Sequence, residues 1–359
     1  MAIALLHPGS AVRVIQLVSL SAVAIAAAAC SGPSTVLGAG PQSALSAAGR
    51  DAEHIDGLFR IMTVGTLLIW WAVVAIAVYT IRVGESHSHP STSSGWSRAT
   101  SRDQRAANLL IPGGGVAAPI VVLGALIAYG MPLVPRVLAI PEDGLSIRVT
   151  AKQWWWRFEY VTPGGPVETA NELRLPVGER VALELASPDV IHSFWVPSLG
   201  GKMDMIPGRM TRLALEPTRT GTFRGTCAEY CGASHALMAF AVVVMEREDF
   251  RAWVEEQARP AVVQSDPLPA RGQMAFIANG CTACHTIRGT PAAGRIGPDL
   301  THVGSRRQIA AETLPNDRAA LVRWITETDT IKPGVHMPAF RALERDELSA
   351  LAAYLSGLK

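Results

Sequence analysis

The side chains best suited to metal chemistry are concentrated in one short stretch, residues 227–238, which reads CAEYCGASHALM. Two thiols, an imidazole and a thioether occur there at the spacing C-x3-C-x3-H-x2-M: Cys227, Cys231, His235 and Met238. These ligand types are soft enough to bind copper. Because strand-like segments flank the stretch, one loop between two strands could hold all of them around a small metal cluster. His192, upstream in DVIHSF, could close the site from another loop.

Zinc is the alternative metal for this group of side chains. Cysteines and a histidine together form structural zinc sites, which are tetrahedral and closed. This stretch lacks the C-x2-C spacing of many such sites, and the additional Met238 also favours copper. Met203 and Met205 are rival thioethers, but they lie outside the stretch, so we expect them to be packing residues.

A second motif, CTACH at residues 281–285, has the pattern C-x-x-C-H that attaches haem covalently. Cys281 and Cys284 would add to the two haem vinyl groups, and the adjacent His285 would fall onto the iron. A redox disulfide or a zinc site is the alternative for the two cysteines.

The sequence around this motif resembles class I cytochrome c over residues 270–359. A helical segment precedes the motif, GPDL follows it at 297–300, and VHMP stands before a final helix. The resemblance implies that Met337 is the second axial ligand, and His/Met ligation favours a raised reduction potential. His336 is the rival ligand beside it, and His302 is expected at the surface or near the haem propionates.

Residues 145–245 have the texture of an all-β domain, with short runs rich in Val, Leu and aromatic residues. Proline and glycine separate the runs, as in TPGGP at 162–166, which is typical of a sandwich or barrel. The expected strands are Leu145–Thr150, Val181–Ala186, Leu213–Glu216 and Phe240–Met245.

The remainder of the chain reads as helical. Glu248–Arg259 is a short polar helix, and 260–269 (PAVVQSDPLP) is a linker that its prolines make semi-rigid. Three segments beyond it show helical spacing of apolar residues: Gly272–Asn279, Asp317–Glu327 and Asp346–Leu358.

Two apolar runs in the first third are long enough to span a membrane, Ile61–Ile81 and Val116–Val134. The second run contains prolines, which membrane helices tolerate. Positive charges outnumber negative ones in the loop between the runs: Arg82, Arg98, Arg102 and Arg105 against Glu85 and Asp103. The positive-inside rule therefore places this loop in the cytoplasm and the later domains outside. A buried hairpin of a large soluble protein is the alternative.

Residues 1–30 read as an export signal, since a positive Arg13 is followed by the apolar run Val14–Ala29. The sequence before Cys30 resembles the lipobox of bacterial lipoproteins, although Ala27 stands where a leucine is usual. Two outcomes stay open: Cys30 is lipidated, or ordinary cleavage nearby leaves it unmodified or removes it.

Composition agrees with a membrane protein of several domains. The 359 residues are 49% hydrophobic, with a mean hydropathy of +0.23, and the net charge of +2 does not suggest a nucleic-acid partner. The five cysteines divide into one, two and two along the chain, which argues against a disulfide framework.

We therefore expect a multidomain membrane protein with a two-helix transmembrane hairpin, an all-β domain and an all-α cytochrome c domain. The expected boundaries are 1–30 for the signal peptide, 55–137 for the hairpin, 138–259 for the all-β domain, 260–269 for the linker and 270–359 for the cytochrome domain.

From the first span to Met245 the sequence resembles subunit II of cytochrome c oxidase, whose cupredoxin domain holds the dinuclear copper centre CuA. Several motifs carry the resemblance in the right order: QWWW at 153–156, HSFWVP at 192–197, KMDMIPGR at 202–209 and the stretch 227–238.

The resemblance implies a role for each side chain of the copper site. Cys227 and Cys231 bridge the two coppers, while His192 and His235 each bind one. Met238 is a weak ligand. Glu229 contributes its backbone carbonyl to copper, and its side chain faces a magnesium or manganese site shared with subunit I.

Two further positions follow from the same resemblance. An exposed Trp154 would match the residue through which electrons enter in this family, and it should share one face with Trp156, with Trp155 on the other. Family members often carry a glutamate at the mouth of a proton channel, but Arg105 stands at the corresponding position here. This chain therefore has an arginine, in place of that carboxylate, at the corresponding position.

The function expected from these resemblances is that of the subunit where electrons enter a proton-translocating terminal oxidase of the caa3 type. Electrons pass from a donor to haem c, then to CuA, then to subunit I, where oxygen is reduced. The expected partners are subunits I and III, cytochrome c or another donor, and membrane lipid. The expected location is a bacterial plasma membrane, with both soluble domains on the periplasmic face.

Two alternative functions remain, one a subunit of another enzyme and one a protein of a different class. A CuA-containing nitric oxide reductase subunit would share the copper motif, although the fused cytochrome argues against it. A membrane-bound electron carrier or copper-delivery protein would need neither two spans nor a dinuclear ligand set. Related quinol oxidase subunits lack the copper ligands, which are intact here.

Overall fold

The computed structural model describes residues 40–86, 101–262 and 266–359. The expected signal peptide, Cys30 and the centre of the arginine-bearing loop lie outside these ranges, so they stay predictions.

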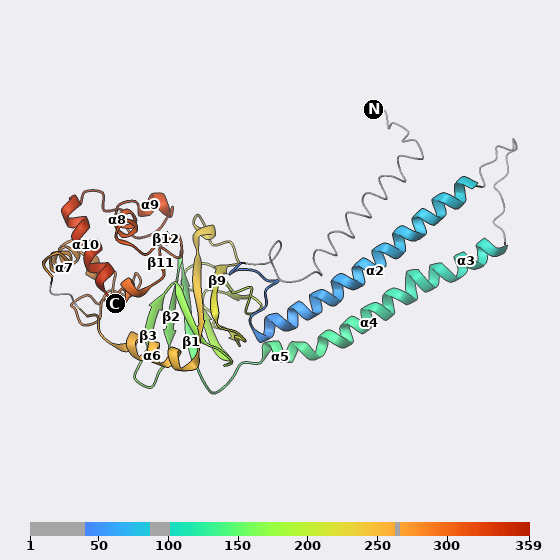
Figure 1. Ribbon diagram of the computed structural model, residues 1–359, viewed down its shortest axis with the longest axis horizontal. Coiled ribbons are helices and arrows are strands. Elements are labelled where there is room, and N and C mark those ends of the chain that lie inside the picture. The colour runs from blue at the N-terminus through green and yellow to red at the C-terminus, as the bar shows by residue number, and fades with distance from the viewer. Residues whose placement is uncertain (1–39, 87–100, 263–265) are drawn as a thin grey trace, which may run out of the picture.

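Two long apolar helices run side by side away from the rest of the molecule (Figure 1). The first is α2 (Arg50–Ser86). The second is divided into α3 (Ser101–Pro112), the π-helical turn η1 (Gly113–Ala117), α4 (Ala118–Gly130), η2 (Met131–Leu133) and α5 (Val134–Leu138). Their candidate spans, Arg50–Arg82 and Ala107–Leu138, have mean hydropathies of 2.3 and 2.1 and are 0% buried. This much unburied apolar surface argues against a buried hairpin and fits a membrane.

Two five-stranded sheets form the next unit, which we call the sandwich domain (residues 145–258). The first sheet has the order β3-β2-β1-β5-β8 and the second β4-β10-β9-β6-β7. The first contains β1 (Ser146–Lys152), β2 (Trp155–Tyr160), β3 (Val167–Ala170), β5 (Val181–Ala186) and β8 (Thr211–Leu215). The second contains β4 (Glu172–Pro176), β6 (His192–Trp195), β7 (Met203–Met205), β9 (Gly221–Cys227) and β10 (Ala239–Met245). Helix α6 (Arg247–Ala258) closes the domain.

The core between the sheets is aromatic. Trp156, Phe194 and Phe240 are fully buried, with ring centroids 4.9 to 5.8 Å apart. Gly225 on β9 lies under the Phe240 ring so closely that any Cβ would collide with it. The core therefore fixes the ends of β6, β9 and β10, from which the metal-ligand candidates project.

The last unit is helical, and we call it the C-terminal domain (residues 267–359). Its helices α7 (Pro267–Ala278) and α10 (Arg345–Gly357) cross where Gly272 lets the backbones meet near Ala350. Between them lie η4 (Cys281–Ala283), η5 (Val303–Ser305), the strand pair β11 (Gln308–Ile309) and β12 (Leu314–Pro315), α8 (Arg318–Thr326) and α9 (Thr328–Ile331). Asp317 caps α8 by accepting the Ala320 N–H at 2.8 Å. Helix α7 begins within the segment expected to be linker.

The C-terminal domain packs on the side of the sandwich away from the membrane helices (Figure 1). Polar contacts between the two domains join Arg157 to the Arg295 carbonyl (2.7 Å), Arg224 to Glu312 (3.0 Å), the Arg307 N–H to Glu172 (3.0 Å), Ser234 to the Pro333 carbonyl (2.7 Å) and Lys332 to the Leu237 carbonyl (2.9 Å). The two domains are therefore docked as well as linked.

One arginine fastens the sandwich to both membrane helices. Arg180 donates to both carboxylate oxygens of Asp51, in the first turn of α2, at 3.2 Å. It also donates to the carbonyls of Arg136, Val137 and Ala139 at the end of α5, at 3.0 to 3.3 Å. The orphan carbonyls at that helix end and a buried carboxylate thus share one guanidinium.

Candidate metal and haem centres

The expected copper ligands gather at one end of the sandwich. His192 begins β6, Cys227 ends β9, and the loop 227–238 that follows, which we call the ligand loop, returns into β10. Backbone hydrogen bonds close the loop, from the Cys227 N–H to the Met238 carbonyl at 3.0 Å and from the Ala228 N–H to the Ser193 carbonyl at 2.9 Å. The register of β6, β9 and β10 therefore brings a histidine from one loop beside two cysteines from another.

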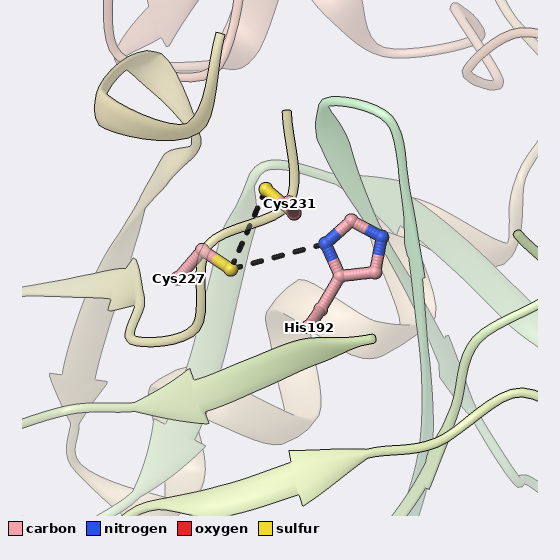
Figure 2. Close-up of side chains that lie close together, drawn as sticks. All are labelled: His192, Cys227 and Cys231. Carbon is pink, nitrogen blue, oxygen red and sulfur yellow. Dashed lines mark hydrogen bonds between the residues drawn. The ribbon is translucent and has the colours of Figure 1, made fainter. Parts of the chain in front are cut away.

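The sulfur and nitrogen atoms lie at the spacing of a small metal cluster. Cys227 Sγ is 3.8 Å from Cys231 Sγ and 3.8 Å from His192 Nδ1 (Figure 2). Cys231 Sγ is 3.5 Å from His235 Nδ1 and 3.8 Å from Met238 Sδ. The ligand atoms of His192, Cys227 and Cys231 all lie within 4.8 Å of one another, and these side chains are buried.

The pKa values of the two thiols are shifted in opposite directions. The hydrogen bond from Cys231, aided by His192 and by backbone groups of Ser193 and Glu229, lowers the pKa of Cys227. The hydrogen bond with Cys227, together with burial, raises the pKa of Cys231. Two thiolates this close repel each other, so losing both protons requires cations between them. Buried thiols, imidazoles and a thioether suit copper, so the donor set fits the group that the sequence implies.

Asp189 sets the orientation of His192. Its Oδ1 accepts from His192 Nε2 at 2.8 Å, which leaves Nδ1 directed at Cys227. Although burial alone would raise it, hydrogen bonds from His192 and from the Gln153 and Val190 amides lower the pKa of Asp189 to about 2. No sequence motif marks Asp189 as functional, although it stands three positions before His192.

The remaining candidates of the ligand loop occupy different environments. Met238 is fully buried beside Cys231, whereas His235 is half-buried with the exposed Tyr230 ring 5.8 Å away. The Glu229 carbonyl lies 3.2 Å from Cys227 Sγ, while its carboxylate accepts the Tyr230 N–H. Met203 and Met205, the rival thioethers, lie on β7, and both pack with the sandwich core as expected.

The three adjacent tryptophans divide as predicted. Trp154 Nε1 donates to the Cys231 carbonyl at 2.9 Å, and Trp156 Nε1 lies 3.4 Å from the Met238 carbonyl, so both face the ligand loop. Trp155 instead lies against the cations of Lys152 and Arg157. The exposed Trp154 expected from the resemblance is not observed: the side chain is only 5% exposed, because Gly334 of the C-terminal domain lies against its ring.

The haem motif occupies a prepared position in the C-terminal domain. His285 Nδ1 lies 2.8 Å from the Pro298 carbonyl, to which it donates, and this leaves Nε2 free for iron. Burial lowers the pKa of His285, which favours the neutral ligand form. A Cβ on Gly297 would meet the His285 ring at 2.6 Å, so the glycine gives this ring its room. Cys281 and Cys284 are half-buried free thiols, and the donor set fits covalently held haem.

The candidates for the second axial haem ligand differ in burial. Met337 is half-buried and packs against the core of the C-terminal domain, whereas His336 is exposed. His302 is buried, and its Nε2 lies 3.1 Å from the Arg259 carbonyl. Its Nδ1 is buried without a hydrogen-bond partner within the described ranges.

Comparisons with known proteins match the two soluble domains separately. Residues 164–245 match the family model described as cytochrome c oxidase subunit II, periplasmic domain, and residues 269–359 match that of cytochrome c. A cytochrome c oxidase subunit 2 from Alkalihalophilus pseudofirmus is 40% identical over 220 residues, covering 61% of this chain and 63% of that relative. One from Branchiostoma floridae is 33% identical over 156 residues, covering 38% of this chain and 68% of that relative.

A solved structure, the periplasmic domain of subunit II of cytochrome oxidase from Bradyrhizobium japonicum, is 34% identical. The match covers 33% of this chain and 97% of the solved chain, with a TM-score of 0.32. The match to the first relatives, from Alkalihalophilus pseudofirmus and Bacillus subtilis, spans 63% of their own length.

The fold and the matched families define a membrane-anchored cupredoxin-like protein with a fused cytochrome c, and they confirm the expected fold class. The cupredoxin family implies copper and the cytochrome family implies haem c. The chain belongs to the cytochrome c oxidase subunit 2 family.

Proposed function

We propose that this chain is the subunit where electrons enter a haem–copper terminal oxidase, passing from haem c through dinuclear CuA to an oxygen-reducing subunit I. The observation that carries the proposal is the meeting of His192, Cys227 and Cys231 in one buried cluster at the tip of a cupredoxin-like sandwich. Subunit I and a cytochrome c or another electron donor are the partners that this role requires.

Within the proposed copper site the side chains have distinct tasks. Cys227, Cys231, His192 and His235 would hold the copper, and Met238 would be a weaker ligand. When bound, the centre supplies one-electron redox chemistry with little change of geometry. The protein holds the thiols apart at 3.8 Å, excludes water by burial and keeps His192 aligned through Asp189.

Glu229 is proposed to serve two partners through two different groups. Its carbonyl points at the copper site, at 3.2 Å from Cys227 Sγ. Its half-buried side chain is available to a magnesium or manganese ion shared with subunit I, because hard carboxylate oxygens suit such ions.

The proposed location follows from the charges around the two apolar helices. Arginines in the segment between them favour the cytoplasmic side, which puts the sandwich and C-terminal domains on the periplasmic face of a bacterial plasma membrane. Subunit III, lipid around the helices and lipidation of Cys30 belong to the same proposal.

Copper counting in the purified full-length chain tests the metal assignment. The wild type should bind two coppers and show a mixed-valence EPR signal, whereas Cys227→Ser should abolish that signal because a bridging thiolate is lost. Met203→Leu is the matched control, since this thioether lies outside the ligand loop and should leave the signal unchanged. A wild-type protein that binds one copper, or none, contradicts the proposed centre.

A further inference from the structure

A buried lysine joins the C-terminal domain to the ligand loop. Lys332 is 2% exposed, and its Nζ donates to the Leu237 carbonyl of the ligand loop at 2.9 Å. The same Nζ donates to the Ala310 carbonyl in its own domain at 3.3 Å. Leu237 stands between His235 and Met238, so the lysine is hydrogen-bonded to the backbone of the ligand loop itself.

Burying a lysine costs free energy unless hydrogen bonds to its amine offset the loss of water. Burial lowers the pKa of Lys332 to about 7, and in the described part of the chain its ammonium forms no ion pair. A buried amine must keep its hydrogen bonds, and removing either acceptor leaves it unsatisfied. While the domains are docked and water is excluded, the donors of Lys332 therefore rely on one carbonyl from each domain.

The turn that Lys332 holds in its own domain has an unusual backbone. Ala310, Ala311 and Glu312 all have φ between 53° and 63°, in the left-handed region that non-glycine residues rarely adopt. Each such residue costs about 1 kcal/mol or more, so contacts from outside must hold the turn. Thr313 Oγ1 and Lys332 Nζ donate to the Ala310 carbonyl at 2.8 and 3.3 Å, and Arg224 of the sandwich pairs with Glu312 at 3.0 Å.

The residues that follow Lys332 continue along the ligand loop. The Pro333 carbonyl accepts from Ser234 Oγ at 2.7 Å, and Gly334 lies against the Trp154 ring. Met337, the proposed haem ligand, is three residues further on. One short segment thus leads from the haem side of the C-terminal domain to the ligand loop.

We propose that Lys332 is a positioning residue that locks the segment bearing Met337 onto the ligand loop, so that haem and copper form one rigid electron-transfer unit. The inference rests on the proposed function. Transfer in a locked unit does not wait for a domain collision, so its rate is independent of solvent viscosity. An unlocked C-terminal domain would transfer electrons only after diffusing back, and viscosity would slow it.

The test uses the purified oxidase complex, with Lys332→Met removing the donor at similar length. Lys359→Met is the matched control, because that lysine is exposed at the chain end. Amide hydrogen exchange is followed in peptides covering 232–240 and 307–315, and haem-to-copper transfer is timed at increasing glycerol concentration. Lys332→Gln, which keeps one amide donor, serves if the methionine variant does not assemble.

In the wild type and the Lys359→Met control we expect slow exchange in both peptides and a viscosity-independent transfer rate. Lys332→Met should accelerate exchange there by about tenfold, because two hydrogen bonds are lost, and should make transfer viscosity-dependent. Lys332→Gln should fall between the two. Wild-type exchange and viscosity independence in the variants would overturn the lock.

Failure of the proposed function has a different signature. In that case the wild type itself would lack the copper signal or show no haem-to-copper transfer. The exchange measurement would still report whether Lys332 holds the domains together.

Discussion

Gly334 lies directly against the indole of Trp154, so closely that a Cβ at position 334 would come within 2.8 Å of the ring atom Cη2. Trp154 in turn donates to the Cys231 carbonyl at 2.9 Å. The C-terminal domain therefore covers the tryptophan proposed to receive electrons. We therefore propose that the chain's own cytochrome domain, which contacts Trp154, delivers electrons to it.

Gly334→Ala should loosen the docked domains. The new methyl group would collide with Trp154, and φ of +82° strains any side chain, together costing about 1 to 3 kcal/mol. We expect hydrogen exchange in peptide 232–240 to accelerate by about tenfold, as measured by mass spectrometry. Gly165→Ala is the control: its φ is +108°, but nothing lies within 4 Å of the added methyl group. Equal exchange in both variants would show that the contact with Trp154 is unimportant.

The metal-binding candidates could be predicted from sequence because most of them are local. Cys227, Cys231, His235 and Met238 stand within one loop, so their spacing alone brings them together. His192 comes from a different strand, so its place in the site could be suggested from its sequence context but not fixed by spacing. The four strands expected from runs rich in Val, Leu and aromatic residues match β1, β5, β8 and β10 except at their ends, whereas β3, β4 and β7 were not expected.

The docking of the two soluble domains could not be predicted in the same way. The proline-rich segment 260–269 reads as a spacer, and nothing local marks Lys332 or Gly334 as interface residues. Their importance depends on which backbone atoms the other domain presents, such as the Leu237 carbonyl. Asp189 could not be predicted for a related reason, because its role depends on the rotamer of His192.

Arg180→Met should destabilise the attachment of the sandwich to the membrane helices. It leaves the Asp51 carboxylate buried without its guanidinium, for which we expect a loss of about 3 kcal/mol. Denaturant unfolding of the detergent-solubilised chain, followed by tryptophan fluorescence, measures the loss. Arg212→Met is the matched control, because its pair with Glu184 is 3.8 Å long and exposed, and should cost less than about 1 kcal/mol. Similar losses for both variants would argue against the attachment role.

Asp189→Asn should weaken copper binding while the thiols stay in place. The amide keeps the shape of the carboxylate but loses the charge that orients His192 through Nε2. Loss of such a partner lowers metal affinity by about tenfold or more, which a competition titration with a copper chelator measures. Asp204→Asn, an exposed carboxylate paired with Lys202, should leave the affinity unchanged. Unchanged affinity in Asp189→Asn would show that packing alone orients His192.

Met337→Leu should leave haem attached and change its ligation. Cys281 and Cys284 are the proposed covalent attachment sites of the haem, so the mass of the chain should still include it. Loss of the thioether should lower the haem reduction potential, since His/Met ligation raises it. His336→Leu is the control, because His336 is exposed and should not reach the iron. A potentiometric titration that shifts for His336→Leu and not for Met337→Leu would reverse the assignment.

Removing Ala270–Lys359 should open the face of the sandwich that carries Trp154. The deletion takes away Gly334 from the Trp154 ring and Lys332 from the Leu237 carbonyl. The proposed copper ligands all belong to the sandwich, so the copper signal should persist in the truncated complex. Oxidase activity should then depend strongly on added soluble cytochrome c, whereas the intact complex should accept electrons from small reductants at haem c.

Stopped-flow reduction followed at haem and copper wavelengths checks the order in which haem c and copper are reduced. Copper reduced before haem c in the intact complex, at a rate that the truncation does not change, would contradict the proposed path.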